Sequence, residues 1–202
     1  MAFTPEFVPQ TELDAVNQML LSIGLSPVNT LTVQGIKDVD NARLVLHNTL
    51  REVLGKGWNF NTDECYPLSP DSNGKVAIPG NALDADPVEQ CDDFVERVDP
   101  ADDERRFYDR KNRTFVISKQ VKCDITWFFE YEAIPQAARA HIAQKAGRIF
   151  QIGRKPSQIV YQFTKERELE TLVELQRQER RSRDSNFFNH DSVSARIFHR
   201  II

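Results

Sequence analysis

Residues 135–152, PQAARAHIAQKAGRIFQI, and the charged run 157–184 behind them decide the fold of the C-terminal half. In the first stretch apolar residues recur at helical spacing, at Ala138, Ile142, Ala146 and Ile149. The second stretch predicts a much longer, densely charged helix with apolar anchors at Val160, Phe163, Leu169, Leu172 and Leu175. A helix that polar cannot bury itself on its own chain, so we expect it to lie against neighbours or in solvent. Neither stretch contains a catalytic motif, and together they indicate a subunit of a larger assembly rather than an enzyme.

The composition is ordinary for a soluble protein, with 40% apolar and 28% charged residues in a chain of 202 and a net charge of −4. No apolar run approaches the roughly 18 residues of a membrane span, and residues 1–10 lack the basic and apolar regions of a secretory signal. Cys65, Cys91 and Cys123 are widely spaced and suit a reducing compartment. We therefore expect no membrane contact and no disulfide framework.

Residues 1–57 predict two amphipathic helices. Thr11 is a candidate N-cap with Asp14 as its capping-box partner, and Gly24 is a candidate helix end. The second helix is expected over about residues 40–54, with its stripe at Ala42, Leu46, Leu50 and Val53. Neither helix can hide its stripe alone, so both are expected to pack in one bundle with the helices of 135–184.

In residues 58–134 apolar and polar residues recur with a period of two, which is typical of strands. The clearest strand spans 121–131 and places six residues on one face, Val121, Cys123, Ile125, Trp127, Phe129 and Tyr131. Alternation at 58–61 predicts a strand that returns at 75–78 after a turn at 71–74, and segments 106–109 and 113–118 predict a hairpin. The order helix, helix, strands, helix, helix predicts an α+β fold, a helical bundle with an inserted antiparallel β-domain and a long C-terminal helix.

Charge is distributed unevenly along the chain. Residues 84–104 hold ten acidic residues and one basic residue, Arg97, so this block carries −9 and the rest of the chain carries +5. We interpret the block as a solvated acidic loop. The alternative is a lobe that repels nucleic acid or meets a basic partner.

The last segment, 185–202, combines basic residues with apolar ones. The adjacent Phe187 and Phe188 and the terminal pair Ile201 and Ile202 are costly to leave in water. We therefore interpret the segment as a docking arm that becomes ordered on a partner, with a frayed tail as the alternative.

Recognisable catalytic and cofactor motifs are absent from the sequence. The eight glycines never form GxGxxG or a phosphate-binding loop, and no histidine has a second histidine or a cysteine at metal-ligand spacing. Carboxylate pairs abound but carry no specificity without a cleft. A basic cluster at 105–113 is interpreted as a solvated turn, with a contact to DNA or to an acidic neighbour as the alternative. We predict no enzyme, no cofactor and no metal.

The order of short landmarks along the chain is distinctive. TELDAVN at 11–17 and LSIG at 21–24 are followed by DNAR at 40–43, GWNFN at 57–61, YDR at 108–110, Trp127, Ile134-Pro135, 146–150 and NFF at 186–188. In order and spacing these landmarks resemble the tail tubular protein A family of short-tailed bacteriophages. The resemblance covers nearly the whole chain, although no single motif is unique.

The resemblance implies a structural virion protein, a head-to-tail adaptor, also called a connector or gatekeeper. Such proteins form a dodecameric ring between the portal protein and a tail nozzle of the tail tubular protein B type. Double-stranded DNA passes through the lumen during ejection without its sequence being read. The resemblance therefore implies a location in the virion tail, after assembly in the host cytoplasm.

Within this interpretation we expect two sets of docking residues. The portal-docking set is Phe187, Phe188, Ile197, Phe198, Ile201 and Ile202. The nozzle-facing set lies at hairpin tips, at Asp71, Asn73, Gly74, Arg110, Lys111 and Asn112.

Two alternatives belong to other functional classes. A tail-associated polysaccharide hydrolase requires a pocket with two carboxylates about 5–10 Å apart and aromatic residues that stack on sugars. A DNA-binding module requires a basic surface and a steep salt dependence of binding, and the −9 block argues against it.

Overall fold

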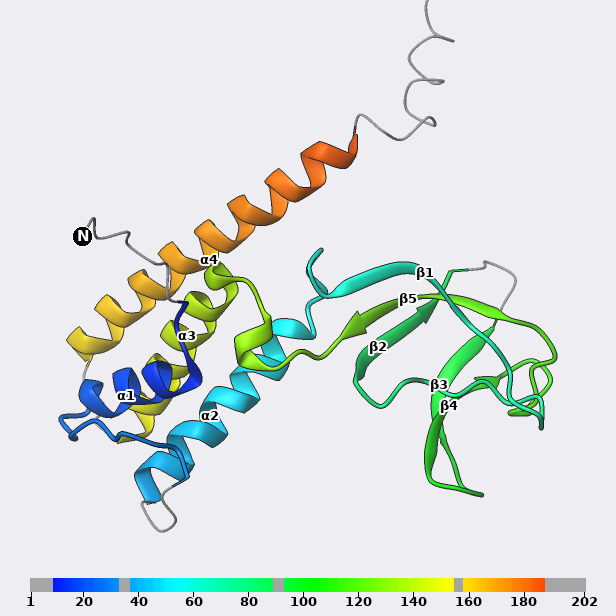
Figure 1. The fold of residues 1–202 in the computed structure, drawn as a ribbon, viewed down its shortest axis with the longest axis horizontal. Coiled ribbons are helices and arrows are strands. Elements are labelled where there is room, and N and C mark those ends of the chain that lie inside the picture. Colours follow the sequence, from blue (N-terminus) through cyan, green and yellow to red (C-terminus); the bar gives the residue numbers. More distant parts are fainter. Residues whose placement is uncertain (1–8, 33–36, 89–92, 155–157, 188–202) are drawn as a thin grey trace, which may run out of the picture. The chain divides into compact units, whose positions relative to one another are not determined.

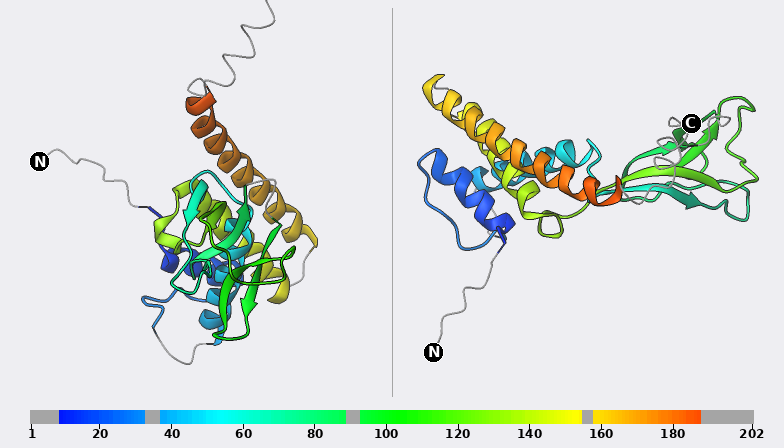
Figure 2. Two further views of the ribbon diagram at one scale, coloured as in Figure 1. Left: turned by 90° about the vertical axis from the view of Figure 1, so that its right-hand side faces the viewer. Right: turned by 90° about the horizontal axis from the view of Figure 1, so that it is seen from above.

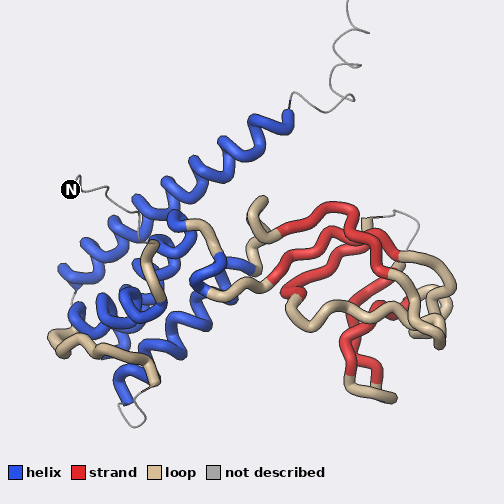
Figure 3. Tube along the Cα trace, in the orientation of Figure 1, coloured by secondary structure: helices blue, strands red, loops and turns tan. Residues whose placement is uncertain are grey.

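The computed structural model describes residues 9–32, 37–88, 93–154 and 158–187. The fold is α+β, as predicted, and the helices and strands are separated along the chain (Figures 1 and 3). The described helices are α1 (Glu12–Ser22), α2 (Lys37–Leu54), the 3-10 helix η1 (Tyr131–Ala133), α3 (Gln136–Arg154) and α4 (Gln158–Phe187). The described strands are β1 (Thr62–Leu68), β2 (Ala82–Pro87), β3 (Phe94–Asp99), β4 (Glu104–Asp109) and β5 (Val121–Trp127).

The chain divides into two compact units. The helical unit combines Met1–Leu50 with Glu130–Ile202, and the β unit is Arg51–Phe129, so the division falls within the last turn of α2. Among the described residues no helix combines the length and the apolar character needed to cross a membrane.

The ends of α1 follow directly from its sequence. The Asp14 amide donates to the Thr11 hydroxyl at 3.1 Å, and the Thr11 amide donates to the Asp14 carboxylate at 2.9 Å, which forms the predicted capping box. At the other end Gly24 has φ 84°, and the Leu25 amide donates to the Leu20 carbonyl at 3.0 Å. This is a Schellman ending, which favours glycine because a side chain strains the left-handed conformation.

The predicted stripe of α2 is confirmed, because each of its four residues is at most 1% exposed. The stripe of α3 is confirmed at Ala138, Ile142 and Ala146, but the prediction for Ile149 is wrong. Ile149 is 38% exposed and Phe150 is 4% exposed. The buried row of α3 keeps a step of four residues, which follows one of the side-chain ridges along a helix surface.

Helices α3 and α4 pack in antiparallel directions. Arg148 pairs with Glu168, and His141 Nδ1 lies 3.3 Å from Thr171 Oγ1, so later residues of α3 meet earlier residues of α4. Leu175 of α4 is 1% exposed. The expectation that α4 finds no burial on its own chain is therefore wrong for this inner face.

Two of the expected apolar anchors of α4 do not serve as anchors. Phe163 is 66% exposed and Leu169 is 51% exposed, whereas Leu172 is half-buried. The Val160 side chain lies outside the described part of the structure. Figure 1 and the left view of Figure 2 show that the C-terminal end of α4 extends beyond α1 and α3.

Strand β5 is the centre of the β unit. It pairs antiparallel with β1 on one side and β2 on the other. Val121, Cys123 and Ile125 are fully buried on its predicted apolar face. The strand ends at Trp127 rather than at residue 131, because residues 131–133 form η1.

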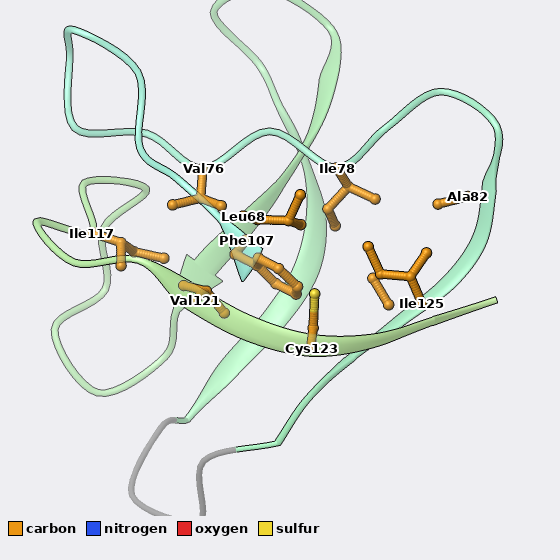
Figure 4. Close-up of a cluster of buried hydrophobic side chains, with 10 residues drawn as sticks. Leu68, Val76, Ile78, Ala82, Phe107, Ile117, Val121, Cys123 and Ile125 are labelled. Carbon is orange, nitrogen blue, oxygen red and sulfur yellow. The ribbon is translucent and has the colours of Figure 1, made fainter. Parts of the chain in front are cut away.

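The core of the β unit surrounds Phe107 of β4, which is fully buried (Figure 4). Its neighbours in the buried cluster come from strands and from extended segments, and they are Leu68, Val76, Ile78, Ala82, Ala85, Ile117, Val121, Cys123 and Ile125. The expected strand at 75–78 is thus an extended core segment, which makes isolated bridges from Lys75 to Val116 and from Ala77 to Arg106.

The strand predicted at 58–61 is wrong. Residues 58–61 form a turn that precedes β1. Asn61 is 1% exposed, and its side-chain amide donates to the carbonyls of Leu54 at 3.0 Å and Trp127 at 2.8 Å. The asparagine therefore satisfies buried backbone carbonyls. The alternation of Asn59 and Asn61 with Trp58 and Phe60 does not reflect a strand.

The loop predicted at 84–104 is wrong over its described part, although most of the described acidic residues of this block are exposed to solvent, as expected. This block contains most of β2 and all of β3, and β3 pairs with β4 in a two-stranded sheet. Residues 113–118, expected to pair with 106–109, do so at Thr114, which exchanges two backbone hydrogen bonds with Asp109, whereas Val116 forms a bridge with Lys75. The acidic composition drew attention away from the apolar Phe94, Val95 and Val98 of β3, because charge runs usually indicate solvated loops.

Truncation of a buried residue of α2 should destabilise the protein far more than truncation of an exposed one. Leu46→Ala removes a fully packed side chain and should lower the free energy of unfolding by about 2–5 kcal/mol. Leu44→Ala is the control, because Leu44 is 59% exposed, and it should change this energy by less than about 0.5 kcal/mol. Urea unfolding followed by far-UV circular dichroism measures both, and equal losses would contradict the assigned face of α2.

Candidate assembly surfaces

The predicted nozzle-facing turn at 71–74 is held by Asp71. Its carboxylate accepts the amides of Asn73 at 2.8 Å and Lys75 at 2.9 Å, and it accepts the Arg106 guanidinium at 3.1 Å. The Lys75 amide is the main reason that the pKa of Asp71 lies below its usual value. Asp71 is therefore a residue that builds the turn, and the exposed Asn73 is the one available for a partner.

The second predicted tip, at 110–112, is organised by Asp109. Its carboxylate accepts the Asn112 amide at 2.9 Å and the Asn112 side-chain nitrogen at 2.7 Å, and these bonds lower its pKa. Arg110 lies 3.5 Å from Asp93. Lys111 is exposed at the tip, so it is the side chain of this turn most available for a partner.

The structure brings the bases of these two turns together. The Ile117 amide donates to the Gly74 carbonyl at 2.6 Å, and Lys75 forms a bridge with Val116. Gly74 has φ 74°, and a Cβ at this position would lie 3.0 Å from Val116 Cγ1. Glycine is therefore required at 74 by conformation and by space, and its predicted role at the surface is also a structural one.

A buried arginine organises the acidic block. Arg106 is 6% exposed and donates to Asp102 and Glu104, each at 2.7 Å, besides Asp71. Its hydrogen bond is the main reason that the pKa of Asp102 lies below its usual value. Nearby, Lys75 Nζ donates to Asp99 at 2.5 Å and lowers the pKa of that carboxyl. These acidic residues are therefore counter-ions of buried cations.

Ion pairing also neutralises part of the basic cluster at 105–113. Arg105 makes two hydrogen bonds to Glu96, at 2.7 and 2.9 Å. With Arg106 surrounded by carboxylates, both arginines are neutralised by their own chain. Contacts to DNA phosphates require available positive charge. The pairing of Arg105 and Arg106 therefore argues against the hypothesis that this cluster binds DNA.

Two described hollows test the hydrolase alternative. One, of about 330 Å³ in the β unit, is lined by Arg51, Gly80, Asn81, Ala82, Leu83, Arg105 and Phe128. The other, of about 350 Å³ on α4, is lined by Leu169, Glu170, Val173 and Arg177. Neither holds the carboxylate pair that glycoside hydrolysis requires. Among the described residues no group of three or more His, Cys, Asp or Glu side chains is placed to hold a metal ion.

The expected portal-docking residues fall at or beyond the end of α4. Phe187 is the last residue of α4, three positions past the expected end of the helix, and its side chain is not described. Phe188, Ile197, Phe198, Ile201 and Ile202 lie outside the described residues.

Sequence reasoning missed Arg106 and the outward face of α4. Arg106 gave no signal of burial because it sits among charged residues. Val173, 45% exposed, lies four residues after Leu169 on the helix, and this spacing was visible in the sequence. It marks a second apolar face on a helix that was expected to have one.

Comparison with known proteins gives one family. The chain matches the family model described as Tail tubular protein over residues 13–185. This range includes every helix and strand of the described structure except one residue of α1 and two of α4. No curated protein matches the chain significantly.

Acid should destabilise the β unit. The pKa values of Asp71, Asp99 and Asp102 are lower in the folded state than in the unfolded chain. Their stabilising contribution is complete above the unfolded value of about 4 and is lost as the pH falls through the folded values. The free energy of unfolding should therefore fall between about pH 5 and pH 2. Tryptophan fluorescence during urea unfolding measures it, because Trp58 and Trp127 both lie in the β unit.

The variant Arg106→Met tests the cause of this acid sensitivity. It should be less stable than the wild type at pH 7 and should show a shallower pH dependence, because Asp102 has lost its partner. Arg110→Met is the matched control at an exposed arginine. If Arg110→Met flattened the profile as much as Arg106→Met, the buried network would not be the cause.

Proposed function

We propose, from the premise that the chain belongs to the tail tubular protein family, that it is the adaptor subunit joining the portal to the tail nozzle. Family membership makes the chain a structural protein of the bacteriophage tail. The observation that carries the finer role is α4, a helix of 30 residues whose outer face exposes Phe163, Leu169 and Val173. Such a face is costly in water and is typical of a subunit that is completed by partners.

A ring is the assembly that we propose, with twelve copies as the family resemblance implies. In a cyclic ring each copy presents two different surfaces, one to each neighbour. Exposed ion pairs contribute only about 0–1 kcal/mol each, but every contact is repeated at each interface around the closed ring. The charged surface of α4 suits this mode of association because many weak contacts add up without a large apolar surface on the free subunit.

Residues 185–202 are the proposed portal-docking arm. The support is chemical, since the segment that begins in the last turn of α4 carries Phe187, Phe188, Ile197, Phe198, Ile201 and Ile202. Apolar side chains of this kind gain about 1.5–3 kcal/mol each when a partner buries them.

The exposed tips at Asn73 and Lys111 are the proposed nozzle contacts. Backbone contacts join Gly74 and Lys75 to Ile117 and Val116, a few residues after the second turn, so both turns belong to one part of the β unit. Loops held by a rigid scaffold are the common place for binding residues. Double-stranded DNA passing through the ring is proposed to make no sequence-specific contact, because Arg105 and Arg106 are already paired.

Removal of residues 188–202 should abolish binding to the purified portal ring. The helical unit should remain folded, because the truncation leaves every described helix intact. Co-sedimentation with portal rings measures binding, and circular dichroism measures folding. A truncated chain that is folded and still binds the portal would disprove the docking arm.

Charge reversal at Lys111 should weaken binding to the nozzle and leave portal binding unchanged. Lys111→Glu should raise the dissociation constant for the nozzle by about tenfold, equivalent to about 1.4 kcal/mol. Lys56→Glu is the control, because Lys56 is an exposed lysine elsewhere in the β unit. Surface plasmon resonance with immobilised nozzle protein measures both variants, and equal losses would show only a general effect of charge.

A further inference from the structure

Helix α4 has two faces of opposite character. Its inner face meets α3 through Glu168, Thr171 and the buried Leu175. Its other side exposes Phe163, Leu169 and Val173 at 66%, 51% and 45%. We define the outer stripe as Phe163, Glu166, Leu169, Glu170, Val173, Arg177 and Arg180. These positions follow one another at steps of one, three or four residues and so share one side of the helix.

The outer stripe is hollowed at its centre. A shallow hollow of about 350 Å³ is lined by Leu169, Glu170, Val173 and Arg177. Side chains of a second helix pack into such a gap between successive turns, which is the ordinary geometry of helix packing. The stripe therefore has a shape that accepts another helix.

Charge along the outer stripe is arranged antisymmetrically about Val173. Glu166 and Glu170 precede Val173, and Arg177 and Arg180 follow it. Arg177 lies 3.5 Å from Glu174, both well exposed. The structure, over the residues it describes, records no ion-pair partner for Glu166, Glu170 or Arg180.

This arrangement is complementary to itself when one helix is reversed. In an antiparallel pair centred on Val173, Glu166 lies opposite Arg180 of the second copy, and Leu169 lies opposite Arg177. Glu166 and Arg180 are then each about 10 Å from the centre, at 1.5 Å per residue. A parallel pair would place like charges opposite each other, which is unfavourable.

We propose that the outer stripe of α4 binds a second copy of this chain in antiparallel orientation, forming a two-fold symmetric dimer centred on Val173. A contact between single helices belongs to the small interfaces below about 1,200 Å², so the dimer is weak, with a dissociation constant on the order of micromolar. A two-fold interface uses the same patch on both copies and closes on itself. The dimer does not depend on the adaptor role, but in an adaptor it would keep free copies from joining through this face before assembly.

The first test is the mass of the full chain in solution. Sedimentation equilibrium at micromolar concentrations and low salt should give a monomer–dimer equilibrium that shifts toward monomer at high salt. Val173→Asp should raise the dissociation constant at least tenfold. Leu44→Asp is the control, because Leu44 is an exposed apolar residue on another helix, α2, and it should leave the equilibrium unchanged. Circular dichroism checks that both variants remain folded.

The second test exchanges the charges. Glu166→Lys and Arg180→Glu should each weaken the dimer several-fold, because each places like charges opposite one another. The double variant should restore the wild-type affinity, since the pair is complementary again with its signs reversed. This recovery separates pairing between copies from a general effect on α4.

The third test determines the orientation by cross-linking. In a Cys65→Ser, Cys91→Ser background the remaining thiol is Cys123, which is fully buried and has its pKa raised to about 11 by burial, so it does not react. With a short bis-maleimide, Val173→Cys should cross-link to itself. Leu169→Cys should cross-link efficiently only when it is mixed with Arg177→Cys.

Three outcomes would overturn the proposal. The first is a full chain that stays monomeric up to high micromolar concentration. The second is a dimer that Val173→Asp and Leu44→Asp affect equally. The third is cross-linking of Leu169→Cys to itself as efficiently as Val173→Cys, because that pattern belongs to a parallel pair. Loss of portal or nozzle binding would instead bear on the proposed function alone.

Discussion

The helical unit depends on the antiparallel packing of α3 with α4. Helix α3 contacts both α1 and α4, and its buried row contains the small residues Ala138 and Ala146, which allow close approach of neighbouring helices. On α4 this contact buries a narrow inner face around Leu175, with the Arg148–Glu168 pair beside it. Because α3 can cover only one side of a longer helix, the opposite side of α4 stays exposed along with its apolar residues. The surface that we assign to association is thus a consequence of how α4 is held.

In the β unit the corresponding constraint is the burial of cations. Arg106 is nearly inaccessible to solvent, and burial of an unpaired charge is very unfavourable. The carboxylates of Asp71 and Asp102 compensate it and at the same time connect the 71–74 turn to the β3–β4 hairpin. These two acidic residues therefore stabilise the fold, although the sequence suggests a surface that repels negative charge. Lys111, by contrast, is exposed, and it is one of the tips that we propose for contact with a partner.

Local sequence signals predicted the helices and the central strand well. The capping box at Thr11, the ending at Gly24, the stripe of α2 and the apolar face of β5 each depend on residues a few positions apart, and each is present in the structure. The errors occurred where a partner distant in sequence decides. The Asn61 side chain donates a hydrogen bond to the carbonyl of Trp127, 66 residues later, and the segment that was predicted as a strand forms a turn. For the candidate site, sequence located the tips of the turns, and the structure adds that Asp71 and Gly74 also build the turn.

The α+β class, the family and the approximate extent of α4 follow from the amino-acid sequence alone, because periodicity, caps and the order of landmarks are properties of the chain read along its length. The side of α4 that is covered, the strands of the acidic block and the burial of Arg106 among carboxylates became visible in the folded chain. These outcomes depend on which segments meet in space. Burial and ion pairing are set by neighbours from other parts of the chain. The identity of a charged or apolar residue does not show whether a neighbour or water covers it.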